Sequence, residues 1–275
     1  MIRTTDLFDS ALVRVERIDH PPGAPHVDPR EEVAQGYSIN FLEAGHFDVT
    51  VGGRHWRVGP REVFVTAPGQ VQTFAHEERH EAPGDVCVAV SFKAPAHDEL
   101  HARFRAAGGV PRVSALTNRR AYLRHRLLEA LARPADSLAI DVIAGELVAD
   151  PFDPNGARVY APSQLAWYAR RVDAARQRMD VGFAADHPLA CLARDAGMSP
   201  YHFARVFRDL AGLPPHRYLL RRRLAAAAAR LRDGARVTDT CFAVGFQSLS
   251  HFIHSFRRAY GVAPSKVRTH RSSLG

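Results

Sequence analysis

Two segments near the end of this 275-residue chain carry the same pattern of histidine, phenylalanine and arginine. HFARVFRDLAGLPP begins at His202, and HFIHSFRRAYGVAP begins at His251, 49 residues later. Six of the fourteen positions are identical, and Arg208 and Arg257 are one of these pairs. Arginine side chains that face outward from a helix can bind phosphate groups and guanine edges. The repeat therefore predicts one helical unit built twice, with side chains suited to nucleic acid.

The first copy has the residues that a helix, a tight turn and a second helix require. Gly197 stands where a helix end needs a positive φ angle, and Ser199 is an N-cap residue followed by Pro200 at the first helical position. Apolar residues then recur at i, i+3, i+4 and i+7 from Phe203, which predicts a buried stripe. The side chains left on or near the opposite face are Tyr201, His202, Arg205 and Arg208.

The second copy follows the same plan, with a turn at Gly245, an N-cap at Ser248 and buried Phe252 and Phe256. Between the copies, PHRYLLRRRLAAAAARL predicts a long helix that holds the two units at a fixed separation. A helical bundle without a binding role would bury the same apolar stripes. It would not explain a basic outer face at equivalent positions in both copies.

Charge is distributed unevenly along the chain. Residues 163–275 contain 19 Lys and Arg, 18 of them Arg, against 7 Asp and no Glu, which is a net charge of +12. The remaining residues carry a net charge of −4. A segment this basic favours a polyanionic partner, although a merely solvated basic surface would have the same composition.

Residues 37–92 show the signals of β structure. Short alternating runs such as HFDVTV place Phe47, Val49 and Val51 on one face, and Gly52-Gly53 predicts a two-residue hairpin. AYLRHRLLEALAR and SLAIDVIAGELV then predict a helical hairpin, and the Pro-rich and Asp-rich residues 151–162 predict a linker. The expected fold class is α+β: a β-barrel with a helical hairpin in residues 1–150, then an all-α domain in residues 163–275.

Composition excludes several classes of protein. The sequence has no run of about 18 apolar residues that could span a bilayer. MIRTTDLFDS lacks the apolar stretch of a signal peptide, so we expect a cytoplasmic protein without a membrane partner. The three cysteines (Cys87, Cys191 and Cys241) are far apart and form no CxxC, which argues against a disulfide framework and a cysteine-rich zinc site.

The stretches DAGMSPYHFARVFRDLAGLPPHRYLLRRRL and AVGFQSLSHFIHSFRRAYGVAPSKVR resemble the DNA-binding domain of the AraC/XylS family of transcriptional regulators, over about residues 163–268. The resemblance implies two helix-turn-helix units with recognition helices at residues 199–211 and 248–260. It places Tyr201, Ala204 and Arg205 at base-reading positions of the first helix. The full set of expected DNA-binding residues is Ser199, Tyr201, His202, Ala204, Arg205, Arg208, Ser248, Leu249, Ser250, Ile253, His254 and Arg257.

Two positions depart from the family pattern. His254 stands where the second recognition helix usually has a basic residue, and Thr240-Cys241 replaces the usual Ile-Ala of the preceding helix. Neither change removes a glycine or proline that the fold needs. Because His254 replaces a basic residue in the second recognition helix, we expect the first helix-turn-helix unit to specify DNA sequence more strongly than the second.

The N-terminal half, best in GGRHWRVGPREVFVTAPGQVQTF, resembles the cupin-like ligand-binding and dimerisation domain of the same family. That resemblance implies a small-ligand site inside the barrel, and Trp56 and Phe74 are candidate lining residues. Enzymatic cupins usually bind a metal through a His-x-His pair, a Glu and a later His. Here Gly45-His46-Phe47-Asp48 stands where the His-x-His pair would be, and Gln72 stands near the place of the later histidine. We therefore expect no metal and no cofactor.

Two histidine pairs, His76 with His80 and His97 with His101, have a spacing at which one helix could present both to a metal ion. Because the sequence places no carboxylate or third ligand beside either pair, we interpret them as solvated histidines.

The chain is thus expected to be a sequence-specific transcriptional regulator and not an enzyme. Its expected partners are double-stranded promoter DNA, a small-molecule effector and a second copy of the chain, with RNA polymerase as a further candidate. One alternative is a metal-dependent cupin enzyme fused to a DNA-binding tail, which intact ligand spacing would favour. Others are a DNA-repair methyl acceptor, which needs a thiolate cluster where only Cys87 stands, and a sequence-independent architectural DNA binder.

Overall fold

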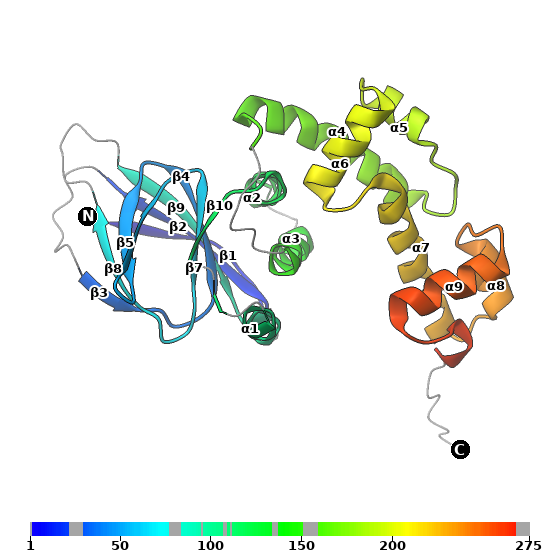
Figure 1. The fold of residues 1–275 in the computed structure, drawn as a ribbon, viewed down its shortest axis with the longest axis horizontal. Helices are drawn as coiled ribbons and strands as arrows, with labels where there is room; N and C mark the ends of the chain where they lie inside the picture. Colours follow the sequence, from blue (N-terminus) through cyan, green and yellow to red (C-terminus); the bar gives the residue numbers. More distant parts are fainter. Residues whose placement is uncertain are drawn as a thin grey trace, which may run out of the picture. The chain divides into compact units, whose positions relative to one another are not determined.

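The computed structural model describes residues 2–21, 30–76, 84–94, 96–106, 109–110, 112–133, 137–150 and 159–267. The chain forms two compact units, Met1–Leu165 and Ala166–Gly275 (Figure 1). Most of the expected linker, residues 151–158, lies outside the described residues. The first helix after it begins at Pro162, within the segment predicted to be linker.

The N-terminal unit contains ten strands in the residues that the structure describes. They are β1 (Arg3–Asp9), β2 (Val13–His20), β3 (Arg30–Val33), β4 (Ser38–Ala44), β5 (Phe47–Val51), β6 (Arg54–Val58), β7 (Glu62–Thr66), β8 (Val71–His76), β9 (Asp85–Phe92) and β10 (Val113–Ala115). All paired strands are antiparallel. The predicted hairpin is confirmed, because Val51 pairs with Arg54 and both Gly52 and Gly53 have positive φ angles.

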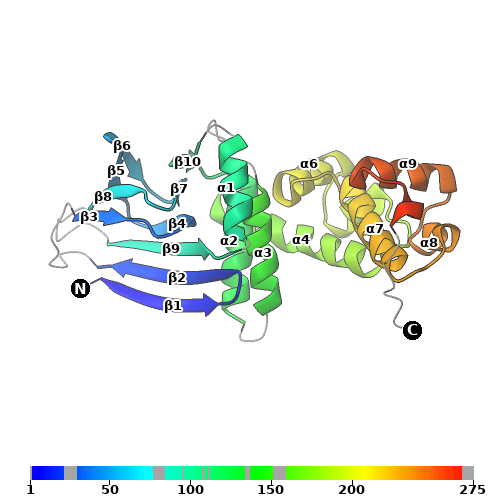
Figure 2. The same ribbon diagram turned by 90° about the horizontal axis from the view of Figure 1, so that it is seen from below.

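The strands form two sheets that pack face to face. One sheet has the order β1-β2-β9-β4-β7-β10, and the other has the order β3-β8-β5-β6 (Figure 2). A single apolar cluster contains Leu42, Phe64 and Cys87 from the first sheet and Phe47 and Val49 from the second. The alternation that predicted one buried face of β5 is therefore confirmed.

Three helices lie together at one end of the larger sheet: α1 (Ala96–Ala106), α2 (Asn118–Leu131) and α3 (Ser137–Ala149). The ring of Tyr37 packs on Phe104 of α1, and Ser10, in the turn between β1 and β2, donates a 2.7 Å hydrogen bond to Asp141 of α3. The predicted helical hairpin corresponds to α2 and α3, which pack on each other.

The C-terminal unit is all-α in its described part. It contains α4 (Pro162–Val181), α5 (Leu189–Asp195), α6 (Pro200–Ala211), α7 (Pro215–Arg232), α8 (Val237–Ala243) and α9 (Leu249–Tyr260), followed by a short 3-10 turn at Pro264–Lys266. The predicted α+β class is confirmed by these two units. Among the described helices, none has the length and apolarity that crossing a bilayer requires.

Candidate functional site

The C-terminal unit contains two helix-turn-helix motifs, α5 with α6 and α8 with α9. The hydroxyl of Ser199 accepts a 3.3 Å hydrogen bond from the backbone N–H of His202, and the hydroxyl of Ser248 accepts one of 3.4 Å from His251. These two serines are the N-caps of α6 and α9, as predicted from the sequence. Both helices end at a glycine with a left-handed backbone, and both are 12 residues long between the serine and the glycine.

The turns of the two motifs differ by one residue. In each motif the first helix ends with a glycine at positive φ, Gly197 after α5 and Gly245 after α8. The residue after each glycine closes a Schellman motif with a 6→1 hydrogen bond: the backbone N–H of Met198 donates to the carbonyl of Ala193, and that of Phe246 donates to the carbonyl of Cys241. The second turn then contains one more residue before its N-cap serine, because Gln247 has no counterpart in the first.

Gly245 also lies where no side chain fits. A Cβ atom there would overlap the carbonyl group of Ala184, in the loop between α4 and α5. The same loop is held from α7 by Arg223, which donates hydrogen bonds to the carbonyls of Phe183 (2.8 Å) and Ala185 (2.9 Å). Phe183 packs against the core of the second motif. This loop therefore links the first half of the unit to the second.

The inner faces of both recognition helices are buried. Phe203, Val206, Phe207 and Leu210 of α6 are inaccessible to solvent, as are Phe252 and Phe256 of α9. This confirms the predicted buried stripes and leaves the opposite faces outward.

On α6, Tyr201 is 82% exposed, Arg205 and Arg208 are exposed, and Ala204 is half-buried. On α9, Ile253 is 37% exposed, Ser250, His254 and Arg257 are exposed, and Leu249 is half-buried. The outward face of α6 therefore combines an aromatic hydroxyl with arginines. The outward face of α9 is less polar near its start and carries its arginines near its end.

His202 differs from its neighbours on α6. Its Nε2 atom lies 3.1 Å from the hydroxyl of Tyr168 on α4, and its Nδ1 atom lies 3.4 Å from the guanidinium of Arg205. The imidazole is half-buried and holds α6 against α4. Of the expected DNA-binding residues, His202 thus contacts both Tyr168 of α4 and Arg205 of its own helix.

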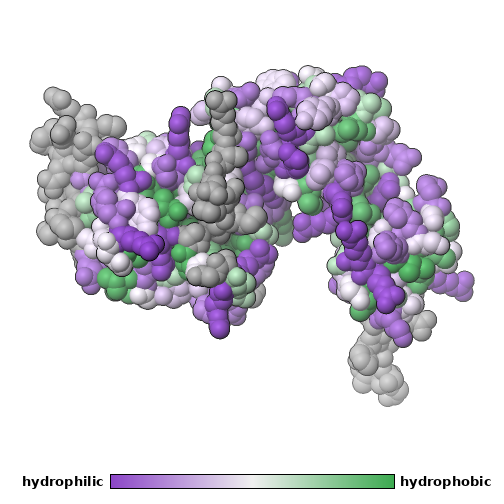
Figure 3. All heavy atoms as spheres, viewed as in Figure 1, coloured by the Kyte–Doolittle hydropathy of each residue, from purple (hydrophilic) through white to green (hydrophobic). Residues whose placement is uncertain are grey.

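Hydrophilic side chains cover much of the visible face of the C-terminal unit (Figure 3). Several arginines are already engaged within it: Arg171 stacks 3.5 Å from the centre of the Trp167 ring, and Arg222 lies 2.7 Å from Asp180. These contacts show that part of the +12 charge stabilises the unit itself. The arginines on the outward faces of α6 and α9 are a distinct set.

The N-terminal unit contains a cavity of about 600 Å³ between its two sheets. One wall is aromatic, with the rings of Phe47, Phe64 and Phe74 in edge-to-face contact at centroid distances of 5.3 to 6.1 Å. Phe74 lines the cavity, as the sequence analysis proposed. Trp56 does not belong to the described lining; like Phe74, it packs against the apolar cluster between the sheets.

Another part of the cavity lining is polar, and its residues are hydrogen-bonded to one another. Asn40 donates hydrogen bonds to the hydroxyl of Ser38 (2.8 Å) and to the carbonyl of Phe64 (3.1 Å), and Ser38 and Thr66 share another of 2.8 Å. Cys87 also lines the cavity, and burial raises the pKa of its thiol to about 12. A thiol that stays protonated at neutral pH is a poor nucleophile, which argues against the methyl-acceptor alternative.

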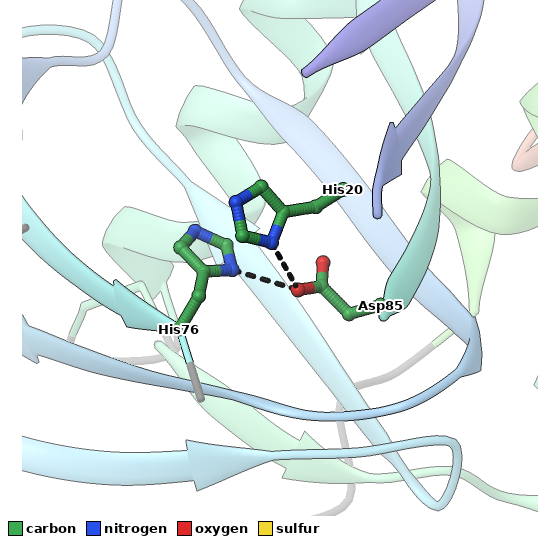
Figure 4. Close-up of side chains that lie close together, drawn as sticks. All are labelled: His20, His76 and Asp85. Carbon is green, nitrogen blue, oxygen red and sulfur yellow. Dashed lines mark hydrogen bonds and ion pairs between the residues drawn. The ribbon is translucent and has the colours of Figure 1, made fainter. Parts of the chain in front are cut away.

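Three titratable side chains meet at this cavity: His20 at the end of β2, His76 at the end of β8 and Asp85 at the start of β9 (Figure 4). Both imidazole Nδ1 atoms face the same carboxylate oxygen of Asp85, at 3.3 Å for His20 and 2.7 Å for His76. The centroids of the two imidazole rings lie 4.0 Å apart. His20 and Asp85 are buried, and the side chain of His76 is 15% exposed.

The structure corrects the interpretation of the histidine pairs. His76 lies on a strand rather than a helix, and a carboxylate and a second imidazole do lie beside it; His80 lies outside the described residues. His97 and His101 do share α1, where both rings contact Tyr37 and the Nδ1 atom of His101 lies 2.9 Å from its hydroxyl. Sequence spacing missed His20 and Asp85, because β2 was not predicted as a strand.

Comparison with known proteins covers both units. The model of the AraC-binding-like domain matches residues 9–153, and the model of a helix-turn-helix domain matches residues 192–270. An HTH-type transcriptional regulator of Mycobacterium tuberculosis is 38% identical over 86 residues, which cover 30% of this chain and 32% of that protein. The HTH-type transcriptional activator AarP of Providencia stuartii is 33% identical over 78 residues, covering 28% of this chain and 58% of AarP.

The chain thus aligns with about a third to three-fifths of the length of these two relatives. Among solved structures, ToxT of Vibrio cholerae with a bound unsaturated fatty acid matches 94% of this chain and 95% of its own, at 11% identity and a TM-score of 0.34.

Proposed function

Because the chain belongs to the AraC family of transcriptional regulators, we propose that it binds promoter DNA through the outward faces of α6 and α9, under the control of a small molecule held in the N-terminal cavity. The observation that carries this proposal is the pair of capped helices, each with a buried aromatic face and an outward face that includes arginine. A helix of this kind, preceded by a second helix and a tight turn, suits docking in the major groove. Binding to promoters would place the chain in the cytoplasm of a bacterium.

The two recognition helices offer different contacts to DNA in this proposal. Arg205 projects from the first half of α6, where bidentate pairing with a guanine edge is possible, and Tyr201 extends beside it. Arg208 and Arg257 are each one turn further along their helices and suit phosphate contacts. On α9, Ile253 can contact a thymine methyl group but cannot distinguish bases by hydrogen bonding.

The cavity supports the ligand-binding part of the proposal. Its volume of about 600 Å³ is in the range of small-molecule sites, and its lining combines aromatic rings with a few hydrogen-bonded polar groups. The expected effector therefore has an apolar body with a polar end. A thermal-shift screen of the full chain against such compounds should raise the melting temperature for a true effector, since binding to the native state alone is stabilising.

We also propose that the chain acts as a homodimer, with α3 at the interface. Leu138 (73% exposed), Val142 (49% exposed), Gly145 and Ala149 are spaced at i, i+4, i+7 and i+11 and form an exposed apolar stripe on α3. A contiguous exposed stripe of this kind is typical of an interaction surface. In sedimentation velocity, Leu138→Glu should shift the chain from dimer to monomer, whereas Val71→Glu, on an exposed strand position, should not. Contact with RNA polymerase is a further part of the proposal, without an assigned surface.

The test of DNA binding is a titration of the full chain with its own upstream duplex and with a scrambled duplex of the same length. The logarithm of affinity should fall with the logarithm of salt concentration, with a slope near 0.9 per neutralised phosphate. Arg208→Ala and Arg257→Ala should each weaken both duplexes alike and reduce that slope by about 0.9. Arg105→Ala, an exposed arginine of the N-terminal unit, is the control. Equal affinity for the two duplexes would instead support a sequence-independent architectural DNA binder. Binding affinity that does not depend on salt concentration would refute the proposed interface.

A further inference from the structure

We propose that the N-terminal unit binds a divalent transition metal ion of the zinc type through His20, His76 and Asp85. The sequence led us to expect no metal here, because the ligand spacing of enzymatic cupins is missing from it. The fold instead assembles three ligands from three strands, and brings His20 of β2 to His76 and Asp85, which are far from it in sequence.

The three side chains are close enough to bind one ion. One ligand atom from each of the three residues can be chosen so that all three lie within 4.8 Å of one another. Zinc bonds to nitrogen and carboxylate oxygen are about 2.0–2.2 Å long, so the edges of a zinc tetrahedron are roughly 3.3 Å. The distance from Asp85 to His20 (3.3 Å) matches that value, and the distance from Asp85 to His76 (2.7 Å) is shorter. Small rotations of the side chains would therefore suffice to admit the ion.

The backbone of three paired strands holds these side chains in place. His20 and Asp85 are directly paired residues of β2 and β9, so the register of the sheet keeps them adjacent. His76 comes from β8, in the other sheet. An ion bound by all three would link the two sheets at the wall of the cavity, and would stabilise this end of the unit more than a contact within one sheet.

The donor atoms also suit a particular class of metal ion. Two imidazoles and one carboxylate are a donor set that zinc and its neighbours in the first transition series prefer, and calcium or magnesium would require more oxygen atoms. Both imidazoles direct Nδ1 toward one carboxylate oxygen, so the donors already converge (Figure 4). The three residues line the cavity. The fourth coordination position accordingly faces the cavity, where water or an oxygen atom of a bound molecule would occupy it.

The same three side chains without a metal form a hydrogen-bonded group, in which the Asp85 carboxylate accepts from both imidazoles. The two cases differ in what the purified protein does with added metal. The full chain, prepared without an affinity tag and treated with a chelator, would be titrated with Co²⁺ and followed by visible absorption, with Zn²⁺ as the competitor. One equivalent per chain should bind with micromolar or tighter affinity and give the intense bands of a four-coordinate ion. Zn²⁺ should displace it and raise the melting temperature.

Variants locate the site. His20→Gln, His76→Gln and Asp85→Asn should each weaken Co²⁺ binding at least tenfold, since each removes a ligand. The double variant His97→Gln with His101→Gln removes the spaced pair on α1 and should retain wild-type binding. Wild-type affinity in all three ligand variants, or loss of binding in the double variant alone, would overturn the proposal.

Circular dichroism establishes which variants fold. If a buried substitution unfolds the unit, X-ray absorption of the wild-type zinc complex decides the matter instead. Two imidazoles with oxygen in the remaining positions support the site, whereas sulfur ligation or an all-oxygen shell overturns it. Failure to bind metal in the wild-type chain overturns it as well, and leaves the proposed DNA binding intact because the two are measured separately.

Discussion

Replacing Gly245 by alanine tests whether the turn of the second helix-turn-helix motif is built as described. Two effects act at this position. Its φ angle of 89° lies in the left-handed region, which disfavours any residue with a Cβ atom by about 1–2 kcal/mol. The added methyl group would also meet the backbone of Ala184, whose Cα and carbonyl carbon would both be 2.9 Å away.

Gly197 is a matched control, because it occupies the equivalent turn of the first motif. Its φ angle is 65°, and a Cβ atom there would have no neighbour within 4 Å among the described residues. Gly197→Ala should therefore cost only the backbone strain of about 1–2 kcal/mol. Gly245→Ala adds overpacking against a backbone that cannot rotate away, at about 1–3 kcal/mol, for a total of roughly 2–5 kcal/mol.

Amide hydrogen exchange measures these energies motif by motif, which a global unfolding curve of a two-unit chain would not. Peptides covering residues 237–261 should exchange at least about 30-fold faster in Gly245→Ala, because 1.4 kcal/mol corresponds to a factor of ten. Peptides covering residues 189–211 should change by about tenfold in Gly197→Ala. Equal effects of the two substitutions would refute the argument that the contact with Ala184, rather than the φ angle alone, restricts position 245.

Two further predictions concern side chains of the C-terminal unit. In titrations at pH 8 and fixed salt, Arg205→Ala should weaken binding to the cognate duplex by about 1–3 kcal/mol and relax specificity at one base pair. His254→Ala should weaken binding to the same duplex by under about 1 kcal/mol. Equal losses of specificity in the two variants would refute unequal reading of DNA by the two motifs. In the native chain at pH 8, iodoacetamide should alkylate the half-buried Cys191 and spare Cys241, whose thiol is buried and has its pKa raised by that burial. Mass spectrometry of tryptic peptides reports both sites, and rapid modification of Cys241 before unfolding would contradict its burial.

The sequence by itself was sufficient for the helix-turn-helix motifs, because the interactions that specify them are local. The caps at Ser199 and Ser248 bond to N–H groups three residues away, and the terminal glycines supply a backbone conformation that other residues adopt at a cost. The apolar stripe of α6 is a property of spacing alone. The 49-residue repeat then showed that the same local solution occurs twice.

Local signals were also enough for the hairpin at Gly52-Gly53, but they were insufficient for β2. The residues VRVERIDH mix charged and apolar side chains, and the strand is specified by its pairing with β9, some 70 residues later. Tertiary structure likewise separated two aromatic residues that sequence treated alike. Phe74 on β8 lines the cavity, whereas Trp56 on β6, beyond β5 in the same sheet, is not part of the described lining, although both pack against the apolar cluster.

The cluster of His20, His76 and Asp85 was decided by tertiary structure alone. Its members are contributed by three strands, and their positions depend on the register of β2 against β9 and on the packing of β8 from the opposite sheet. Neither quantity is a function of spacing along the chain, because strand register is set by which side chains fill the space between the sheets. Capping and periodicity act within about one helical turn, so the sequence determined the proposed DNA-binding surface, whereas only the packed sheets brought these three ligands together.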